Sequence, residues 1–425
     1  MAQGPCLIFD KSSLESLNLD EAVMMDNFYM SAITPLFFVE CLADLEKSIR
    51  SNSTPEQLVG SLANRTPDMQ GNPNAHHLHI LQAELYRQFD ITKVRGRCAL
   101  AGGRRVQLGD KQGVVYQQSE EAEAFMRWSR REFLEVERAI AKRWRRALTA
   151  IDFGVMVTRV SEEIGPWRMP KSLEDAKHIA DTVIDYLDPE FLLNFGLDLL
   201  GVPHDATEWV VNDWKERRRP PLRQHAPYFV FMLTINIFFC LVLPTRLLRN
   251  VKQSHQVDLA YLYYLPFCTV FTSKDNFHAQ IVPLFLGPMQ DFVNGIEFKE
   301  DMKRLVAYYS ALPEDVRAMG LNHFASYPPD DDSFLTTRLW DKYLPRWRET
   351  KNEPKKPRDP EQDKRTIEEL RKMSSAPDVR PDEADDDIDN LSYVALQRPV
   401  YPQKGKWLRF SEEQIQRMKE RGELQ

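Results

Sequence analysis

The sequence predicts an α/β fold in three layers, with a parallel sheet flanked by helices and a mainly α-helical insertion. Short apolar runs alternate with helical periodicity near the start of the chain, and this texture returns after residue 226. Between these two regions, residues 51–225 carry mostly helical patterns. Strand–helix alternation is typical of parallel sheets, because a helix usually joins one parallel strand to the next.

The first elements follow from short local patterns. Residues 4–10 predict a strand, because the apolar run CLIF ends at an acid, and residues 12–26 predict a helix. Residues 28–33 predict a second strand that a Thr-Pro pair closes, and residues 36–49 have helical periodicity. We therefore expect residues 1–50 to form the first part of the sheet core.

The insertion is expected to be a separate, mainly helical subdomain. Residues 51–75 are rich in Asn, Pro, Ser and Gly, which is typical of a loop, and residues 95–117 indicate a basic hairpin with glycine turns. Residues 119–151 predict one long helix, and residues 172–186 predict another, each beginning at a serine N-cap.

The second part of the core is expected at residues 226–310. An apolar stretch at 228–243 is shorter than a membrane span and stops at a proline, so a buried helix is expected and a membrane-associated protein is the weaker alternative. Helices are predicted at 253–264, 276–286 and 297–309, with a strand at 268–272 between the first two.

The C-terminal part divides by composition into three segments. Residues 311–348 are expected to be a helical extension. Residues 349–392 are dominated by charge and proline and predict a disordered linker. Residues 393–425 form a tail that ends in a short charged helix, and this tail is a candidate surface for a protein partner.

Charge and cysteine content limit the class of protein. The net charge is −7, from 63 acids and 56 bases, which leaves room for a nucleic-acid partner because such footprints are local. The five cysteines form no CxxC pair, which indicates a reducing cytoplasm and not a disulfide framework. The N-terminus lacks the basic and long apolar segments of a signal peptide.

Four scattered acids carry the functional prediction. Asp10 ends the first strand, Glu40 lies inside an apolar helix, Asp258 opens a helix and Asp275 follows a strand. Sites in open α/β sheets form at the carboxyl ends of strands. Each acid alone could be a helix cap or a turn residue. Together, carboxylates without basic partners repel one another, so such a cluster persists mainly to hold a cation such as Mg²⁺ or Mn²⁺.

The segments LIFDKS, TPLFFVECLADLEK and DLAYLYYLPFCTVFTSKDNFH together resemble the PIN-like nuclease family. The resemblance covers roughly residues 4–50 and 226–300, and the insertion of about 175 residues between them departs from the family pattern. It implies cleavage of phosphodiesters, most often in RNA, by water that Mg²⁺ or Mn²⁺ activates. The residues implied as metal ligands are Asp10, Glu40, Asp258 and Asp275. The residues implied as supporting neighbours are Ser12, Thr272 and Ser273.

Other candidates are weaker. Asp44 shares a helix face with Glu40 and is either a supporting acid or an ordinary solvated or lysine-paired one. The histidines at 76, 77 and 79 suggest a metal, but no ligand pattern completes a zinc site, so exposed or capping histidines are expected.

Basic runs in the insertion lie near tryptophans, and together they suggest a nucleic-acid grip. For each run alone, a solvated helix face with tryptophans in the core is the simpler interpretation. The residues expected to bind nucleic acid are Arg104, Arg105, Arg143, Arg145 and Arg146.

The sequence therefore predicts a cytoplasmic, divalent-metal-dependent nuclease with RNA as its expected substrate and no membrane partner. The alternative is a catalytically inactive PIN-like scaffold or nucleic-acid-binding protein that uses the basic insertion.

Overall fold

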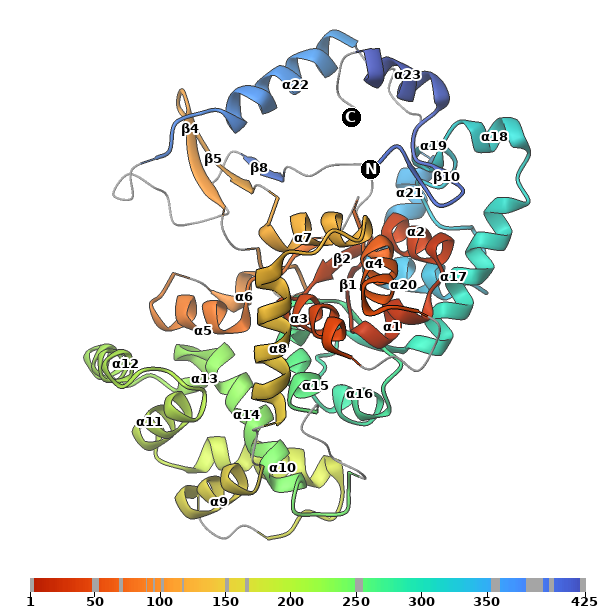
Figure 1. Ribbon diagram of the computed structural model, residues 1–425. Helices are drawn as coiled ribbons and strands as arrows, with labels where there is room; N and C mark the ends of the chain where they lie inside the picture. The colour runs from red at the N-terminus through yellow and green to blue at the C-terminus, as the bar shows by residue number, and fades with distance from the viewer. Residues whose placement is uncertain are drawn as a thin grey trace.

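The computed structural model describes residues 4–47, 53–68, 72–88, 90–94, 96–100, 103–116, 118–149, 153–164, 168–248, 255–352, 360–379, 393–396 and 401–420. A parallel sheet of five strands lies at its centre, in the order β3-β2-β1-β6-β7 (Figure 1). Its strands are β1 (Cys6–Phe9), β2 (Met30–Ile33), β3 (Asn72–Pro73), β6 (Val270–Ser273) and β7 (Asp291–Asn294). The α/β class is thus confirmed, with all four strand pairings parallel.

The two central strands, β1 and β6, are buried along their whole length because helices cover the sheet. All four residues of β1 and of β6 are buried, and Leu7 pairs with Ser31 on one side and Val270 on the other. Strands buried on both faces read as continuous apolar runs, which is the pattern that predicted them.

Helices from both predicted core segments pack around this sheet. Those of the first segment are α1 (Lys11–Ser16), α2 (Leu19–Phe28) and α3 (Pro35–Ala43), with the 3-10 turn η1 (Asp44–Glu46). Those of the second are α14 (Pro227–Val242), α15 (His255–Tyr261), α16 (Asn276–Ile281) and α17 (Gly295–Ser310), with 3-10 segments η2 (Leu262–Phe267) and η3 (Val282–Leu284). Helix α17 packs against α1 and α2, which joins the two segments into one core.

The apolar helix α14 lies inside the protein, as predicted. Nearly all of its side chains are buried, and it packs against helices on several sides. None of the helices in the described ranges is both long enough and apolar enough to cross a bilayer.

The insertion is mainly helical but is not separate from the sheet. Its elements are α4 (Pro55–Arg65), α5 (His77–Leu85), α6 (Ile91–Val94), β4 (Arg104–Leu108), β5 (Lys111–Tyr116), α7 (Glu120–Ser129), α8 (Glu135–Thr149), α9 (Phe153–Ile164), α10 (Leu173–Tyr186), α11 (Pro189–Leu199), α12 (His204–Glu216) and α13 (Leu222–His225). Strand β3 belongs to the central sheet, so the boundary predicted at residue 50 is wrong. Its two residues carry no apolar run, and their pairing with Ala32 and Ile33 alone defines the strand. Helix α4 also replaces part of the loop predicted at 51–75.

The single long helix predicted at 119–151 is in fact two helices, α7 and α8. Arg131 between them adopts a left-handed conformation with φ of 66°, which a continuous helix excludes. The Glu137 side chain accepts a hydrogen bond from the Leu134 N–H (2.8 Å) and another from the Trp128 indole (3.0 Å). The second helix therefore has its own cap, fixed to the end of the first.

The linker predicted to be disordered contains a helix, α22 (Pro360–Ser374), so that prediction is wrong for these residues. The helix packs on the β4-β5 hairpin, to which β8 (Tyr393–Leu396) adds a third strand. Lys111 pairs with Glu369 at 2.9 Å, and Met373 is buried. Contacts with the hairpin supply the order that composition alone does not predict. The remaining predicted linker residues, 353–359 and 380–392, lie outside the described residues.

The remaining elements follow the core. They are α18 (Glu314–Ala318), α19 (Leu321–Phe324), α20 (Leu335–Tyr343), α21 (Trp347–Asn352), β9 (Gln403–Lys404), β10 (Trp407–Leu408) and α23 (Glu412–Glu420). The short helix predicted in the tail is confirmed. Ser411 and Gln414 cap it reciprocally, each side chain accepting from the other's backbone N–H.

Candidate functional site

Asp10 lies at the carboxyl end of β1 and is held by three serines. Its backbone N–H donates to the Thr272 carbonyl (3.3 Å), which fixes it beside β6. One carboxylate oxygen accepts from the Ser13 N–H at 2.9 Å, and the other accepts from the Ser273 hydroxyl at 2.6 Å. The Ser12 hydroxyl lies within 2.9 Å of both oxygens. Asp10 is therefore the N-cap of α1 and also a side chain oriented toward the neighbouring strand.

His278 contacts both Asp10 and Ser273, and the sequence did not predict its role. Its ring is fully buried, with Nδ1 2.8 Å from the Ser273 hydroxyl and 3.4 Å from Asp10 Oδ2. Its Nε2 donates to the backbone carbonyl of Asp258 at 2.8 Å. Since Ser273 already donates to Asp10, Nδ1 is also placed to donate, which is the pattern of an imidazolium.

Electrostatics agree with a charged His278. Burial lowers its pKa, but the hydrogen bond to Asp10 and the charges of Asp10 and Asp258 outweigh burial and raise the pKa to about 9. In turn, burial raises the pKa of Asp10, whereas His278 and Ser273 lower it more, so the net shift is downward. His278 lies three residues beyond Asp275 in the segment KDNFH, but nothing local to that segment indicates its burial.

Glu40 is a carboxyl group whose pKa is raised by its surroundings. Helix α3 begins at the Thr34 N-cap and carries Glu40 to the hydroxyl of Tyr261, which donates to its carboxylate at 2.5 Å. Burial is the main cause that raises the pKa of Glu40 to about 8, and the charges of Asp258 and Asp10 add to it. The Tyr261 hydrogen bond and the charge of Lys11 act in the other direction without prevailing.

Asp258 and Asp275 follow the insertion in the sequence. Asp258 is within α15 and does not begin it, and burial raises its pKa to about 6, helped by the charges of Asp275 and Asp10 and opposed by His278. Asp275 caps α16 by accepting from the Phe277 N–H at 2.7 Å. Its own N–H donates to the Ser273 hydroxyl at 2.9 Å, so one serine links Asp275 to Asp10.

The four predicted acids thus form one electrostatically connected group at the carboxyl edge of the sheet. The negative charge of Asp10 raises the pKa of both Glu40 and Asp258, and the charge of Asp258 also raises the pKa of Glu40. Within the part of the chain that the structure describes, no three His, Cys, Asp or Glu side chains converge closely enough to hold one metal ion. The group can exchange protons near neutral pH, and its donors are the oxygens that hard cations prefer.

The supporting residues divide into two sets. Thr272 is buried, with its hydroxyl 3.5 Å from that of Ser13, and Ser273 contacts Asp10 directly. Asp44 pairs instead with Lys11 at 2.5 Å, so the lysine-paired interpretation of this residue is confirmed.

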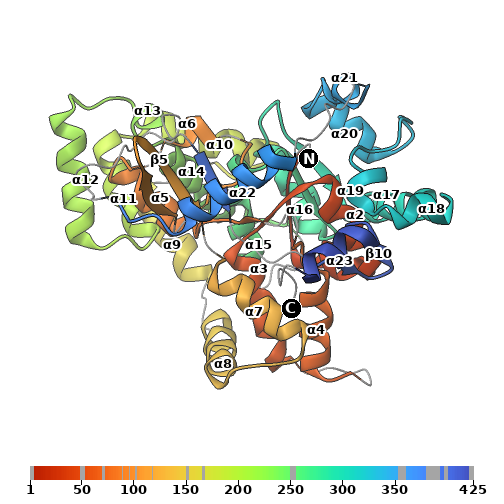
Figure 2. The same cartoon turned by 90° about the horizontal axis from the view of Figure 1, so that it is seen from above.

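The basic residues of the insertion do not form one surface. Arg104 donates to the Ser374 carbonyl (2.6 Å) and to Asp378 (2.6 Å), so it holds the residues that follow α22. Arg105 lies on the same hairpin, whereas Arg143 and Arg146 are exposed on α8, and the side chain of Arg145 lies outside the described residues. Figures 1 and 2 show the hairpin and α8 in separate parts of the molecule.

Two histidines of the cluster, His76 and His77, make local structural contacts. His76 is the N-cap of α5, accepting from the Leu78 N–H at 3.2 Å, which confirms the capping interpretation. His77 contacts the Tyr264 hydroxyl (3.2 Å), and burial lowers the pKa of His77 to about 3.

Comparison of the chain with protein-family models, curated proteins and solved structures finds no match in any of the three. The resemblance to PIN-like nucleases therefore stays a prediction that rests on the residues quoted for it.

Proposed function

We propose that this protein is a divalent-metal-dependent nuclease of the PIN-like kind that acts on RNA. The observation that supports the proposal is the electrostatic interaction among Asp10, Glu40, Asp258 and Asp275, which come from four elements, although no three acidic side chains of the described residues converge on one metal position. Burial, helped by the negative charges nearby, raises the pKa of Glu40 to about 8 and that of Asp258 to about 6. Carboxylates accumulated in this way favour a cation.

The donor set fits Mg²⁺ or Mn²⁺ in chemistry, because carboxylate oxygens are the ligands these hard cations take. When bound, such an ion supplies an activated water and neutralises charge on the scissile phosphate. The chain's own residues have distinct tasks: Ser12 and Ser273 orient Asp10, and Tyr261 orients Glu40. Glu40 is expected to release its proton when a cation binds.

Cleavage assays test the catalytic part. The assay compares the wild type with Asp10→Asn and Asp275→Asn. Each protein is incubated with RNA, single-stranded DNA or duplex DNA, in the presence of Mg²⁺, Mn²⁺ or EDTA. Glu15→Gln is the matched control, because Glu15 is an exposed acid on α1 outside the group. We expect metal-dependent RNA cleavage that both Asn variants lose and the control keeps. Undiminished cleavage by both Asn variants, folded by circular dichroism, would exclude the site.

Calorimetry tests cation binding without catalysis. Mn²⁺ is titrated at pH 7 in two buffers with different ionisation enthalpies, so that released protons are counted. We expect proton release from wild type and less from Glu40→Gln, because the pKa of Glu40 is about 8. Mn²⁺ binding with no proton release, or with equal release from the variant, would contradict the role given to Glu40.

The second candidate, an inactive scaffold or nucleic-acid-binding protein, has its own supporting observation. The charged ring of His278 already neutralises Asp10 from inside the protein. Such an internal cation can stabilise the group without a metal. Binding of RNA, measured by fluorescence anisotropy, with no cleavage in any metal would favour this candidate.

A further inference from the structure

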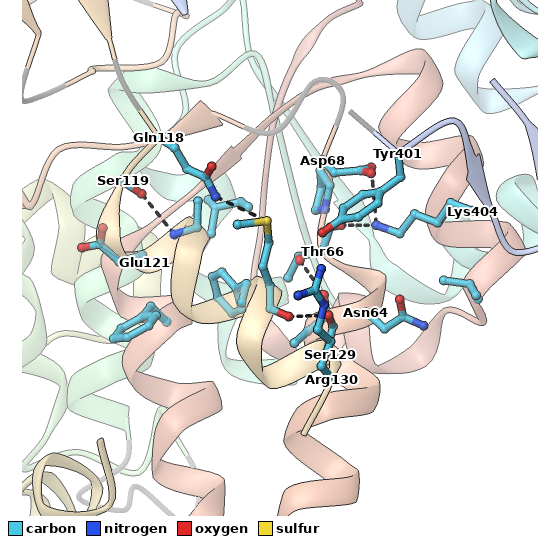
Figure 3. A pocket seen from close by; sticks show the side chains of 18 of the residues that line it. Asn64, Thr66, Asp68, Gln118, Ser119, Glu121, Ser129, Arg130, Tyr401 and Lys404 are labelled. Carbon is cyan, nitrogen blue, oxygen red and sulfur yellow. Dashed lines mark hydrogen bonds and ion pairs between the residues drawn. The ribbon is translucent and has the colours of Figure 1, made fainter. Parts of the chain in front are cut away.

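We infer that the protein binds a nucleoside monophosphate in a cavity separate from the acidic group. The cavity has a volume of about 330 Å³ and lies between α3, the end of α4, α7 and the C-terminal segment around β9 (Figure 3). None of the four acids lines it. This inference does not depend on the proposed nuclease activity.

The walls favour a flat ring. Phe38 and Phe125 line the cavity and meet edge to face, with ring centroids 5.7 Å apart. Tyr401 lines it from the C-terminal segment, and Figure 3 shows it across the cavity from Gln118 and Ser119 of the α7 side. Aromatic side chains that surround an apolar space accept a nucleobase by stacking.

Asn74 contributes a buried polar side chain to the wall of the cavity. It lines the cavity with only 4% of its surface exposed, and its Oδ1 accepts from the Ala99 N–H at 2.9 Å. Its Nδ2 is buried and has no hydrogen-bond partner among the described residues. An unpaired buried donor is unfavourable, and a rotation of this amide would let it pair with a ligand acceptor in the cavity.

Charges around the cavity favour one phosphate. Arg130 and Lys404 line it, as does the N-terminus of α3, whose first turn has no acid. Lys404 also donates to the Thr66 carbonyl at 2.6 Å and pairs with Asp68 at 3.4 Å, so Arg130 is the main cation offered to a phosphate. Asp68 and Glu121 are in the same wall, so a di- or triphosphate would meet more repulsion than a monophosphate.

The C-terminal segment closes this cavity and is firmly attached. Arg409 is buried and pairs with Asp26 at 2.7 Å and with Asp68, which itself lines the cavity. The Lys406 N–H donates to Asp20 at 3.0 Å. A ligand that contacts Tyr401 should therefore also hold the tail in place.

Isothermal titration calorimetry with AMP, GMP, CMP and UMP in EDTA tests the inference, with the matching nucleosides as a second arm. We expect saturable binding of at least one monophosphate, weakened about tenfold or more in Arg130→Gln and in Tyr401→Ala. The control Arg131→Gln changes an exposed neighbour that does not line the cavity and should bind like wild type. Asp10→Asn should also bind normally, which separates this result from the fate of the nuclease proposal.

Limited proteolysis is the supporting measurement, because bound nucleotide should slow cleavage of the tail in wild type and not in Tyr401→Ala. Two outcomes overturn the inference. One is the absence of binding by all four monophosphates at about 1 mM. The other is unchanged affinity in both Arg130→Gln and Tyr401→Ala. Equal affinity for a nucleoside and its monophosphate would show that the cavity does not recognise the phosphate.

Discussion

Replacing Glu84 by glutamine tests how a buried acid couples this fold to pH. Glu84 lies on α5 but caps the start of α14, which has no side-chain cap of its own. Its two oxygens accept from the Tyr228 N–H at 2.7 Å and the Phe229 N–H at 2.9 Å. Burial nevertheless dominates and raises the pKa of Glu84 from its ordinary 4.5 to about 7, while these hydrogen bonds and Arg87 act in the other direction.

Proton linkage gives the sign and the size of the pH-dependent change in unfolding free energy. The folded protein keeps the proton on Glu84 at pH values where the unfolded chain has lost it, so the stabilising contribution is complete below about pH 4.5 and is lost as pH rises through 7. The shift corresponds to about 3 kcal/mol, at about 1.4 kcal/mol for each pH unit. Glutamine resembles the protonated acid and does not titrate. The wild type should therefore lose about 3 kcal/mol relative to Glu84→Gln between pH 4.5 and 8.

Urea unfolding at several pH values, followed by tryptophan fluorescence, measures this difference. Near pH 5 we expect Glu84→Gln to be less stable than the wild type by about 1–3 kcal/mol, because only the amide oxygen can accept and one of the two helix N–H groups loses its acceptor. Glu208→Gln changes an exposed acid and is the control, with no pH-dependent difference expected. A difference between wild type and Glu84→Gln that stays constant from pH 5 to 8 would refute the reasoning.

Three further predictions concern buried charges. Tyr261→Phe removes the hydrogen bond that lowers the pKa of Glu40, so a carboxyl NMR titration should find the pKa above its wild-type value of about 8; an unchanged or lower pKa would contradict this. Arg409→Met leaves Asp26 and Asp68 without their buried cation and should cost about 3–5 kcal/mol of unfolding free energy. A loss below about 1 kcal/mol would show that the pair is not buried in solution. Burial and, after it, the charge of Asp26 raise the pKa of Asp68 to about 6, so Asp26→Asn should lower this pKa, and the same NMR titration applies.

The sequence predicted those strands whose apolar residues are consecutive. The runs CLIF and VFTS are buried on both faces, so their composition identifies them without knowledge of their neighbours. Strand β7, with the residues DFVN, was missed because only its valine is buried. Strand β3 was missed because an Asn-Pro pair is typical of loops, and only its pairing with β2 makes it a strand.

The candidate site was predicted in part for the same reason. Asp10 follows a predicted strand directly and Asp275 lies three residues past another, so their place at the sheet edge could be inferred. His278 could not be identified, because its charge depends on burial beside Asp10, far away in sequence. The ion pair of Asp44 with Lys11 likewise depends on how α1 meets α3.

By itself, the sequence determined the fold class, the central strands, the helix caps and the acids that could form a group. These properties depend on residues within a few positions of one another. Only the tertiary structure decided the protonation of Glu40, the burial of His278 and the cavity closed by Tyr401. Each results from contacts between distant segments, such as Tyr261 with Glu40, because charge interactions and enclosed volume depend on distance in space.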